Sequence, residues 1–428
     1  MRKLAPGLAL MLAGCWQVAV VGDELTTGGS SSTGGRSTSG SSGTGGRSTG
    51  GSTGRSTSGT SSGTGASDVC GPCAPGATCD GGVCVCPGAT DGTCPPSTSD
   101  ESFCFEGTCS WCYVHKGGTL EGDQCRMQLE IVGDSSPGCI AVDSTEVYWN
   151  DTTGLEKVPI EDMTKNSPGG SPQTLYLNQG DQRIVCLAID DTDVYLTVSD
   201  GTIRRVPKTS FDGGAIPPIA SGQDAPQGIA VDRFNVYWTN SGSNEVMRLE
   251  KTAASVQPTV IATLGNVSEG PNAIAVDSNN VYWTDYEGSN VMMVPIDGGV
   301  ATTIAINQEL PSAIAVDGTN VYWTNQGTSE STGQVVKQLL AGAFDGGTVL
   351  AARQQQPSGI AVDGTNVYWT NYSGDSVNFV PIAGGEPGPV FPIATNDPIG
   401  IAVDSNSLYW TSSPPTVYNG AVYQLTPK

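Results

Sequence analysis

Side chains suited to binding chemistry lie just ahead of a short apolar segment that recurs seven times after residue 126 of this 428-residue chain. Six of the seven copies also carry a proline three residues before the segment. Most of the preceding side chains are acidic, and a ring of carboxylates could hold calcium, a cationic peptide or a polyamine. The predicted ligand-binding residues are Asp134, Asp181, Arg183, Asp224, Glu269, Glu309, Gln356 and Asp397. The alternative is that they are ordinary exposed acids of an acidic protein.

Histidine occurs only once in the chain, at His115, and this limits the catalytic mechanisms that are possible. From Met127 to Lys428 the chain therefore lacks His-based acid–base chemistry and any Ser-His-Asp arrangement. No Gly-rich phosphate loop is visible either. A calcium-dependent, lactonase-like hydrolase built from Asp, Glu and Asn stays the alternative, but it needs an asymmetric cluster and the acids recur once per segment. We therefore predict no enzyme, no catalytic residues and no cofactor other than calcium.

Zinc chemistry is suggested only by Cys109, Cys112 and His115, which have acceptable ligand types and close spacing. Neighbouring cysteines follow a disulfide pattern, and cysteines of exported proteins mostly form disulfides. We therefore predict no metal site there.

The repeated segment has the form Ile-Ala-Val-Asp followed by Val-Tyr-Trp, and the twelve residues from Ile314 recur unchanged from Ile360. The repeated aspartates are 40 to 47 residues apart, the period of a four-stranded propeller blade. Ile-Ala-Val is typical of a strand buried on both faces, and Val-Tyr-Trp-Thr is β-branched and aromatic. Turn formers such as Asp317 and Gly318 separate the two and predict a tight hairpin. Two further strands complete each copy, for example at 291–296 and 301–306.

The ends of the array predict ring closure. After the seventh copy only one strand remains, from Ala421 to Leu425, and an unassigned strand from Met127 to Val132 precedes the first copy. This strand would complete the last blade and protect its edge. We predict an all-β fold, a seven-bladed β-propeller over residues 127–428, with six blades as the alternative.

A family resemblance supports this prediction. Val281 to Asp285 reads VYWTD, which matches the YWTD repeat, and the Ile-Ala-Val-Asp segments resemble NHL-type repeats. Propellers of these families usually have six blades, and their loops before the inner strands ring one mouth of the central channel. The resemblance implies binding of a protein, peptide or other ligand; some relatives are lactonases, lyases or synthases.

Residues present in every copy are most simply structural. We therefore interpret the seven aspartates of Ile-Ala-Val-Asp as turn caps rather than ligands. The tryptophans, replaced by Leu196 in the second copy, are expected to pack between sheets. Function is expected where the copies differ.

Charge excludes one class of partner. From Met127 onward the chain has 12 Lys and Arg against 32 Asp and Glu, a balance of −20. Because phosphate binding requires a basic surface, we predict no nucleic-acid partner. Solubility outside the cell is the simplest reason for this acidity.

The first residues predict export. Arg2 and Lys3 precede an apolar stretch, Leu4 to Ala13, that suits a signal peptide and is too short to span a bilayer. The sequence Leu12-Ala13-Gly14-Cys15 resembles a bacterial lipobox, which implies lipidation of Cys15 and a signal peptide over residues 1–14. Trp16 after it implies the outer membrane. An ordinary signal peptide is the alternative.

Residues 15–67 are predicted to be the lipid anchor and a flexible linker, because Gly, Ser and Thr dominate from Thr26 to Ser67. Some 40 such residues give an end-to-end distance of roughly 35 Å. The linker would hold the following domains away from the membrane.

Residues 68–126 contain ten cysteines and few large apolar residues, so disulfides must replace a core. The spacing from Cys70 to Cys94 resembles an EGF-like module. That resemblance implies the pairs Cys70–Cys79, Cys73–Cys84 and Cys86–Cys94. Two further bridges would join Cys104, Cys109, Cys112 and Cys125, with their connectivity open.

Cys139 and Cys186 occupy the same position of the first two copies, where the other copies have Gly or Ala. Small residues indicate a crowded inner strand, so we predict a disulfide between these two blades. Two buried thiols are the alternative.

Together these features predict an exported, lipid-anchored protein of the bacterial cell envelope whose propeller binds a ligand and touches the membrane only through its lipid. A secreted eukaryotic receptor fragment is the alternative origin, for which Asn150, Asn266 and Asn371 would be glycosylation sites. A scaffold role in an envelope assembly is a further alternative function.

Overall fold

The computed structural model describes residues 78–80, 83–85, 102–105, 108–111, 127–160, 172–209, 216–252, 257–265, 270–390, 396–414, 420–426 and 428, with side chains from residue 136 onward. The elements in these ranges are β-strands. None of the described residues belongs to a helix long and apolar enough to cross a membrane.

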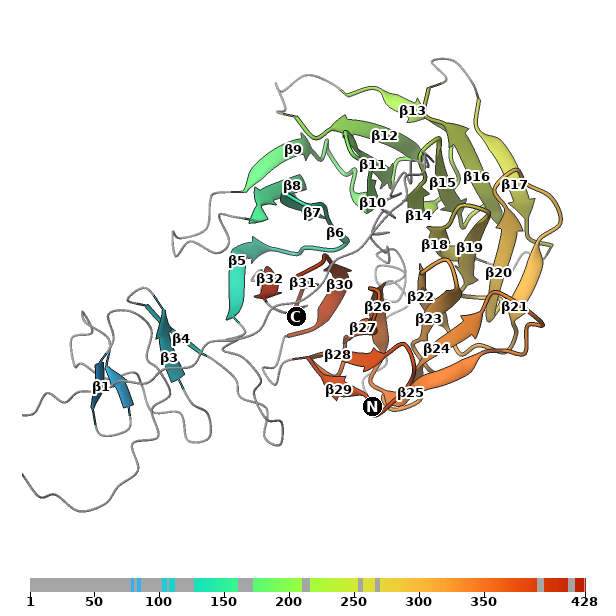
Figure 1. The fold of residues 1–428 in the computed structure, drawn as a ribbon. Helices are drawn as coiled ribbons and strands as arrows, with labels where there is room; N and C mark the ends of the chain where they lie inside the picture. Colours follow the sequence, from blue (N-terminus) through green and yellow to red (C-terminus); the bar gives the residue numbers. More distant parts are fainter. Residues whose placement is uncertain are drawn as a thin grey trace, which may run out of the picture.

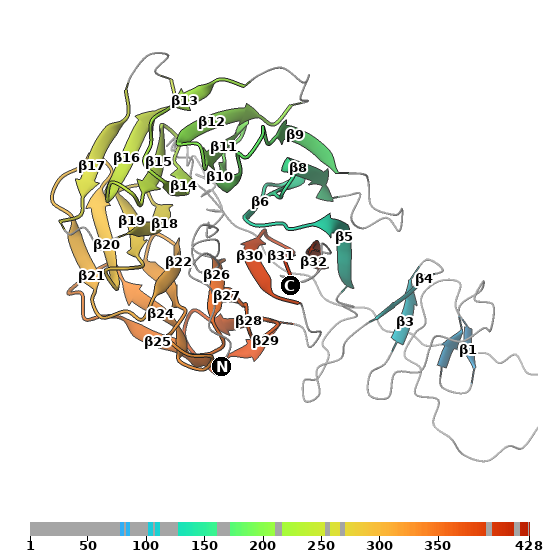
Figure 2. The ribbon, with the colours of Figure 1, turned by 180° about the vertical axis from the view of Figure 1, so that it is seen from behind.

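Seven four-stranded antiparallel sheets surround a central axis (Figures 1 and 2). The predicted seven-bladed propeller is therefore confirmed, and the six-bladed alternative is wrong. Within blades one to six the strands follow chain order from the centre outward, as the repeated hairpins require. Blade one is β6 (Ile140–Val142), β7 (Glu146–Asn150), β8 (Gly154–Pro159) and β9 (Gln173–Leu177); blade two is β10 (Ile184–Ile189), β11 (Asp193–Val198), β12 (Thr202–Pro207) and β13 (Pro218–Ala220).

The middle blades have the same order. Blade three is β14 (Pro226–Val231), β15 (Asn235–Asn240), β16 (Glu245–Glu250) and β17 (Thr259–Thr263). Blade four is β18 (Pro271–Val276), β19 (Asn280–Asp285), β20 (Asn290–Pro295) and β21 (Thr302–Ala305). Blade five is β22 (Pro311–Val316), β23 (Asn320–Asn325), β24 (Gly333–Leu339) and β25 (Thr348–Gln354). Blade six is β26 (Pro357–Val362), β27 (Asn366–Asn371), β28 (Ser376–Pro381) and β29 (Gly388–Pro389).

Blade seven joins the two ends of the domain, as predicted. It consists of β30 (Pro398–Val403), β31 (Leu408–Ser412), β32 (Gly420–Thr426) and, as its outermost strand, β5 (Met127–Ser135). β5 pairs with β32 along its length, from Ser135 opposite Gly420 to Met127 opposite Thr426. The pairing removes a free edge at the seam.

A threonine on the second strand of six blades ties each blade to the next. Thr411 Oγ1 accepts the N–H of Gly400 at 2.9 Å and donates to the carbonyl of Gly138 in blade one at 2.6 Å, which closes the ring. Thr197, Thr239, Thr284, Thr324 and Thr370 make the equivalent bonds to the next blade, and Asn150 does so in blade one.

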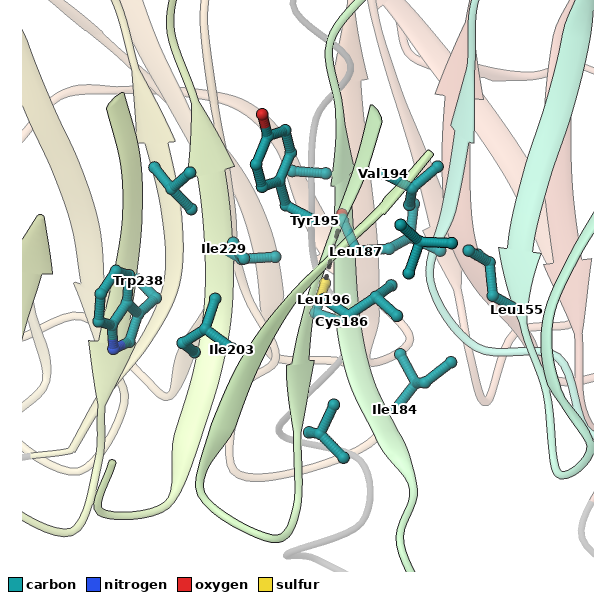
Figure 3. Close-up of a cluster of buried hydrophobic side chains, with 14 of the residues drawn as sticks. Leu155, Ile184, Cys186, Leu187, Val194, Tyr195, Leu196, Ile203, Ile229 and Trp238 are labelled. Carbon is teal, nitrogen blue, oxygen red and sulfur yellow. Dashed lines mark hydrogen bonds between the residues drawn. The ribbon is translucent and has the colours of Figure 1, made fainter. Parts of the chain in front are cut away.

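The core lies between blades, where the aromatic residues of each second strand point in opposite directions. Trp149 clusters with Tyr409 and Val422 of blade seven, whereas Tyr148 lies beneath Lys208 of blade two. Figure 3 shows the same packing from Leu155 through Cys186 and Leu196 to Trp238. Leu196 is fully buried in the place that tryptophan has elsewhere, as predicted.

Two small hairpins precede the ring: β1 (Thr78–Asp80) with β2 (Val83–Val85), and β3 (Ser102–Phe105) with β4 (Thr108–Trp111). The predicted signal peptide, Cys15, the linker, His115 and Cys70, Cys73, Cys86, Cys94, Cys112 and Cys125 lie outside the described residues. Cys79, Cys84, Cys104 and Cys109 lie in these hairpins, where only the backbone is described. The EGF-like pairing therefore stays a prediction.

Candidate functional site

The inner strands separate the acidic residues into two groups at opposite ends of the ring axis. Each inner strand begins just after the loop that enters its blade and ends next to the aspartate of Ile-Ala-Val-Asp, or of Leu-Ala-Ile-Asp in blade two, so these two ends lie on opposite faces. We call the face with the repeated aspartates the turn face. The face with the loops that precede the inner strands is called the rim face.

On the turn face, all seven repeated aspartates are turn caps, as predicted. Asp317 shows the pattern: Oδ1 accepts the N–H groups of Thr319 and Asn320 at 2.8 and 2.7 Å, and Oδ2 accepts the hydroxyl of Tyr322 at 2.7 Å. The same bonds to the residues two, three and five positions later occur at Asp143, Asp190, Asp232, Asp277, Asp363 and Asp404. Both carboxylate oxygens are thus occupied within the protein.

Three of these aspartates also receive a lysine from the next blade. Nζ of Lys208 lies 2.6 Å from Asp143, that of Lys251 lies 2.6 Å from Asp190, and that of Lys428 lies 2.7 Å from Asp363. Burial alone would raise the pKa of Asp143, but hydrogen bonds from Lys208 and from two backbone N–H groups outweigh it and lower that pKa to about 2. At Asp363, too, hydrogen bonds outweigh the effect of burial and lower the pKa to about 2. Sequence reasoning missed these inter-blade ion pairs. The three lysines occupy the same repeat position, but the other four blades have Ile or Leu there, so the repeat pattern does not reveal a lysine.

The structure distributes the described members of the predicted ligand-binding set over several blades, with Asp181 and Arg183 together before the inner strand of blade two. Asp181, Arg183, Asp224 and Glu309 are exposed, while Gln356 and Asp397 are half-buried. Asp134 is in β5, where its side chain is not described, and Glu269 lies outside the described residues.

Four of the described rim loops share one backbone conformation. The residue before the proline has a positive φ in four blades, at Ala225, Leu310, Gln356 and Asp397. Their carbonyls accept N–H groups from the hairpin between the second and third strands, for example Tyr372 N–H to Gln356 at 3.1 Å. Left-handed backbone is unfavourable for these residue types, so tertiary contacts hold the loops in place.

The exposed rim carboxylates differ from those of the turn face in their bonding. Among the described residues, the carboxylates of Asp181, Asp224 and Glu309 have no hydrogen bond or ion pair, although Asp224 packs against Gly242. The structure does not bring the acids together: in the described ranges no group of three or more His, Cys, Asp and Glu side chains has a metal-binding arrangement. They can therefore contact an external ligand individually.

Two acidic residues of the rim, Asp375 and Asp397, meet between blades six and seven. Oδ1 of Asp375 accepts the N–H of Asp397 at 2.9 Å. Burial, and then the charge of Asp375, raises the pKa of Asp397. Burial, Asp397 and Asp375 together raise the pKa of the nearby Tyr372 to about 12. Sequence reasoning missed Asp375, which lies in a hairpin rather than before an inner strand.

A glutamine on three rim loops has a structural role that was also missed. Oε1 of Gln308 accepts the indole N–H of Trp323 at 2.9 Å and the Nδ2–H of Asn325 at 2.8 Å. Gln223 and Gln354 make the same pair of bonds in blades three and six. In blades one, four and seven the indole N–H groups of Trp149, Trp283 and Trp410 are buried without a hydrogen-bond partner. We call this glutamine, bonded to a tryptophan and an asparagine, the glutamine cap. Its sequence signal is Gln at position i with Trp at i+15 and Asn at i+17.

The predicted Cys139–Cys186 disulfide is not formed in this structure, in which both residues are buried thiols. Rotation around the ring relates equivalent positions, so their side chains point the same way. A Cβ at Gly228 would meet the backbone of Ala273 in the next blade, and one at Gly400 would meet Gly138. The side chain of Cys139 likewise points toward the next blade, where its Sγ lies 3.6 Å from the carbonyl oxygen of Val185. Cys139 therefore approaches the backbone beside Cys186, while the Cys186 side chain is directed onward around the ring.

The fold and the rim define the class of protein: a seven-bladed propeller with an acidic rim. Solved structures of similar fold include virginiamycin B lyase from Staphylococcus aureus, with a TM-score of 0.56 and 16% identity, over 70% of this chain and 98% of that one. A catalytically inactive histidine-to-alanine variant of that lyase with quinupristin has a TM-score of 0.55 and 17% identity, over 70% and 99% of the two chains. The propeller domain of Cps50 (Swd1) from Myceliophteria thermophila has a TM-score of 0.53 and 8% identity, over 69% and 99%. No protein-family model and no curated sequence matches the chain. At these identities the likeness shows the fold alone.

Proposed function

We propose that the propeller is a binding module for a positively charged protein or peptide, which it holds on the rim face. The observation that carries the proposal is the contrast between faces. All seven turn-face aspartates are satisfied internally, whereas Asp181, Asp224 and Glu309 present exposed carboxylates without internal partners. The excess of 32 acidic over 12 basic residues after Met127 favours the same class of partner and steers its approach.

An extended ligand fits this arrangement better than a single ion. The described rim acids come from different blades, and calcium needs several oxygen ligands within about 2.3–2.6 Å. A peptide or protein surface can instead contact several blades at once. The geometry therefore favours a peptide or protein over calcium, because a calcium site requires several rim residues to converge on one point.

An enzymatic role is the alternative, because propellers of similar fold include lyases. A histidine-to-alanine variant of virginiamycin B lyase is catalytically inactive. The only histidine of this chain, His115, precedes the propeller. The sequence thus favours binding over that chemistry.

We further propose that Cys15 carries a lipid and that the chain is anchored in the bacterial cell envelope, with residues 15–67 as a stalk. The support is the lipobox-like sequence before Cys15 and the Gly, Ser and Thr composition after it. Expression with a labelled fatty acid should label the wild-type protein and leave Cys15→Ser unlabelled and soluble. Equal labelling of both proteins contradicts this proposal.

Thermal unfolding with calcium, with chelator and with a lysine-rich peptide tests the binding proposal. We expect the peptide to raise the Tm, with the effect lost at high salt because exposed charges are screened. A rise with calcium alone would favour the ion or the lactonase-like hydrolase. No response to any cation would favour a scaffold role.

A further inference from the structure

Two N-glycosylation motifs of the propeller lie within its strands. Asn150 begins the sequence Asn-Asp-Thr, and Asn371 begins Asn-Tyr-Ser; both sequences have the form of an N-glycosylation motif. Such motifs accept a glycan on the protein surface, where the bulky sugar can lie in solvent. Here each asparagine is the last residue of a second strand, β7 or β27, and each is only 6% exposed.

Asn150 holds blade one to blade two. Its Oδ1 accepts the backbone N–H of Cys139 at 2.8 Å, and its Nδ2 donates to the carbonyl of Ile184 in the next blade at 3.1 Å. It stands directly after the Val-Tyr-Trp segment, where the other six blades have the threonine that ties each blade to the next. The amide of Asn150 is therefore part of the contact between blades.

Asn371 belongs to the glutamine cap of blade six. Its Nδ2 donates to Oε1 of Gln354 at 3.0 Å and to Oγ of Ser376 at 3.4 Å. The same Oε1 accepts the indole N–H of Trp369 at 3.0 Å. A substituent on Nδ2 of Asn371 would disturb this buried set of hydrogen bonds.

N-glycosylation would add such a substituent. The reaction joins C1 of a lipid-linked sugar to Nδ2 of asparagine, while the lipid diphosphate leaves and Nδ2 gives up one of its two hydrogens. Because Asn150 and Asn371 are buried, a sugar ring beside Nδ2 has room only if the neighbouring strands separate. We infer that a glycan on Asn150 or on Asn371 and the folded propeller exclude each other.

The consequence concerns the compartment in which the chain folds. The ring closes by pairing of β5 with β32, so it cannot close before the last strand of the chain has been made. A transferase that modifies the chain during its synthesis would therefore reach Asn150 and Asn371 before the ring closes. The chain suits a compartment without this transferase, which supports the proposed bacterial envelope location independently of the lipobox-like sequence and opposes the eukaryotic alternative.

The test is translation of the full chain in a cell-free extract with endoplasmic-reticulum microsomes, which add N-glycans as the chain enters. Thr152→Ala, Ser268→Ala and Ser373→Ala each remove one motif without changing its asparagine, and Thr152 and Ser373 are exposed. Pairs of these substitutions leave Asn150 or Asn371 as the single acceptor. A gel shift separates glycosylated from unglycosylated chains, and limited proteolysis of each band reports whether the propeller is folded.

The matched control carries one glycan at an exposed position. Glu330→Asn, combined with removal of the three natural motifs, creates the sequence Asn-Ser-Thr in an exposed loop of blade five. Its glycosylated chains should resist protease as well as its unglycosylated chains do. Chains with a glycan on Asn150 or Asn371 should show a protease-resistant fraction reduced about tenfold or more, because proteolysis follows the population of open chains.

A further variant separates the glycan from the loss of the asparagine. Asn150→Thr introduces the residue that ties the other six blades, removes the motif and should leave a protease-resistant propeller. The inference is overturned if chains with a glycan on Asn150 or Asn371 resist protease like the control. It is also overturned if the glycan of the Glu330→Asn chain abolishes resistance equally, because the effect would then not depend on burial.

Discussion

In blade five, Asp317 on the turn face accepts hydrogen bonds from Thr319, Asn320 and Tyr322 of its own hairpin, while Glu309 on the rim face is exposed. The other repeated aspartates likewise fix turns, and Asp181 and Asp224 of the rim face are likewise exposed, whereas Asp397 is half-buried. Asp317 and Glu309 have the same charge, so the difference lies in the bonds that the backbone offers them. Turn-face carboxylates therefore contribute to stability, and we propose that the exposed rim carboxylates serve binding.

The largest expected effect is on folding. Asp317→Ala removes the hydrogen bonds from Thr319, Asn320 and Tyr322 and leaves the buried Tyr322 hydroxyl without its acceptor, so the free energy of unfolding should fall by about 2–4 kcal/mol. Glu309→Ala, in the same blade, should change it by less than about 0.5 kcal/mol. Urea denaturation measures both, and equal effects would remove the distinction between the faces.

The inter-blade lysines should have the next largest effect. The Nζ of Lys251 is 2.6 Å from Asp190 and 5.0 Å from the ring centroid of Tyr195. Lys251→Met should cost about 1–3 kcal/mol, because it leaves a partly buried carboxylate without its cation. Arg183→Met, at an exposed rim position, is the control and should be close to neutral in the same denaturation experiment.

The pH dependence of stability should identify the turn-face carboxylates. The folded pKa of Asp143 and Asp363 is about 2, below the ordinary value of 3.8. A lowered folded pKa stabilises the protein above pH 3.8, and this contribution is lost as the pH falls toward 2. Lys208→Met should make the free energy of unfolding fall less steeply over this acidic range. An unchanged pH dependence would mean that the Asp143–Lys208 pair contributes nothing to it.

A smaller change of opposite sign is expected at Glu156 in blade one. Burial raises its folded pKa to about 7, although the hydroxyl of Thr174 opposes the shift, and the charge of Asp151 adds to it. A raised carboxyl pKa gives stability that is present below pH 4.5 and lost as the pH rises through 7. Glu156→Gln should therefore be more stable than wild type at pH 8 and similar at pH 4. Thermal unfolding at the two pH values checks this; a variant less stable at pH 8 would contradict it.

The sequence was sufficient for the propeller because each blade repeats the same local rules. Alternation of Tyr and Trp, the Asp turn and the single strands at both ends specified seven blades and their closure by β5. It failed for Cys139 and Cys186, because the direction of a side chain around a ring cannot be read from a matching repeat position. It also missed Lys208, Lys251, Asp375 and the glutamine caps, whose partners lie in another blade or many residues away.

The central claim is that binding belongs to the rim face, and a charge-matched comparison tests it most directly. Asp181→Asn, Asp224→Asn and Glu309→Gln together remove three rim charges. The control removes three exposed charges of the turn face by Asp191→Asn, Asp297→Asn and Asp345→Asn. Calorimetric titration with a lysine-rich peptide should show affinity reduced about tenfold or more for the rim variant, and by much less for the control. Equal losses in the two variants would show that only net charge matters and would contradict a rim site.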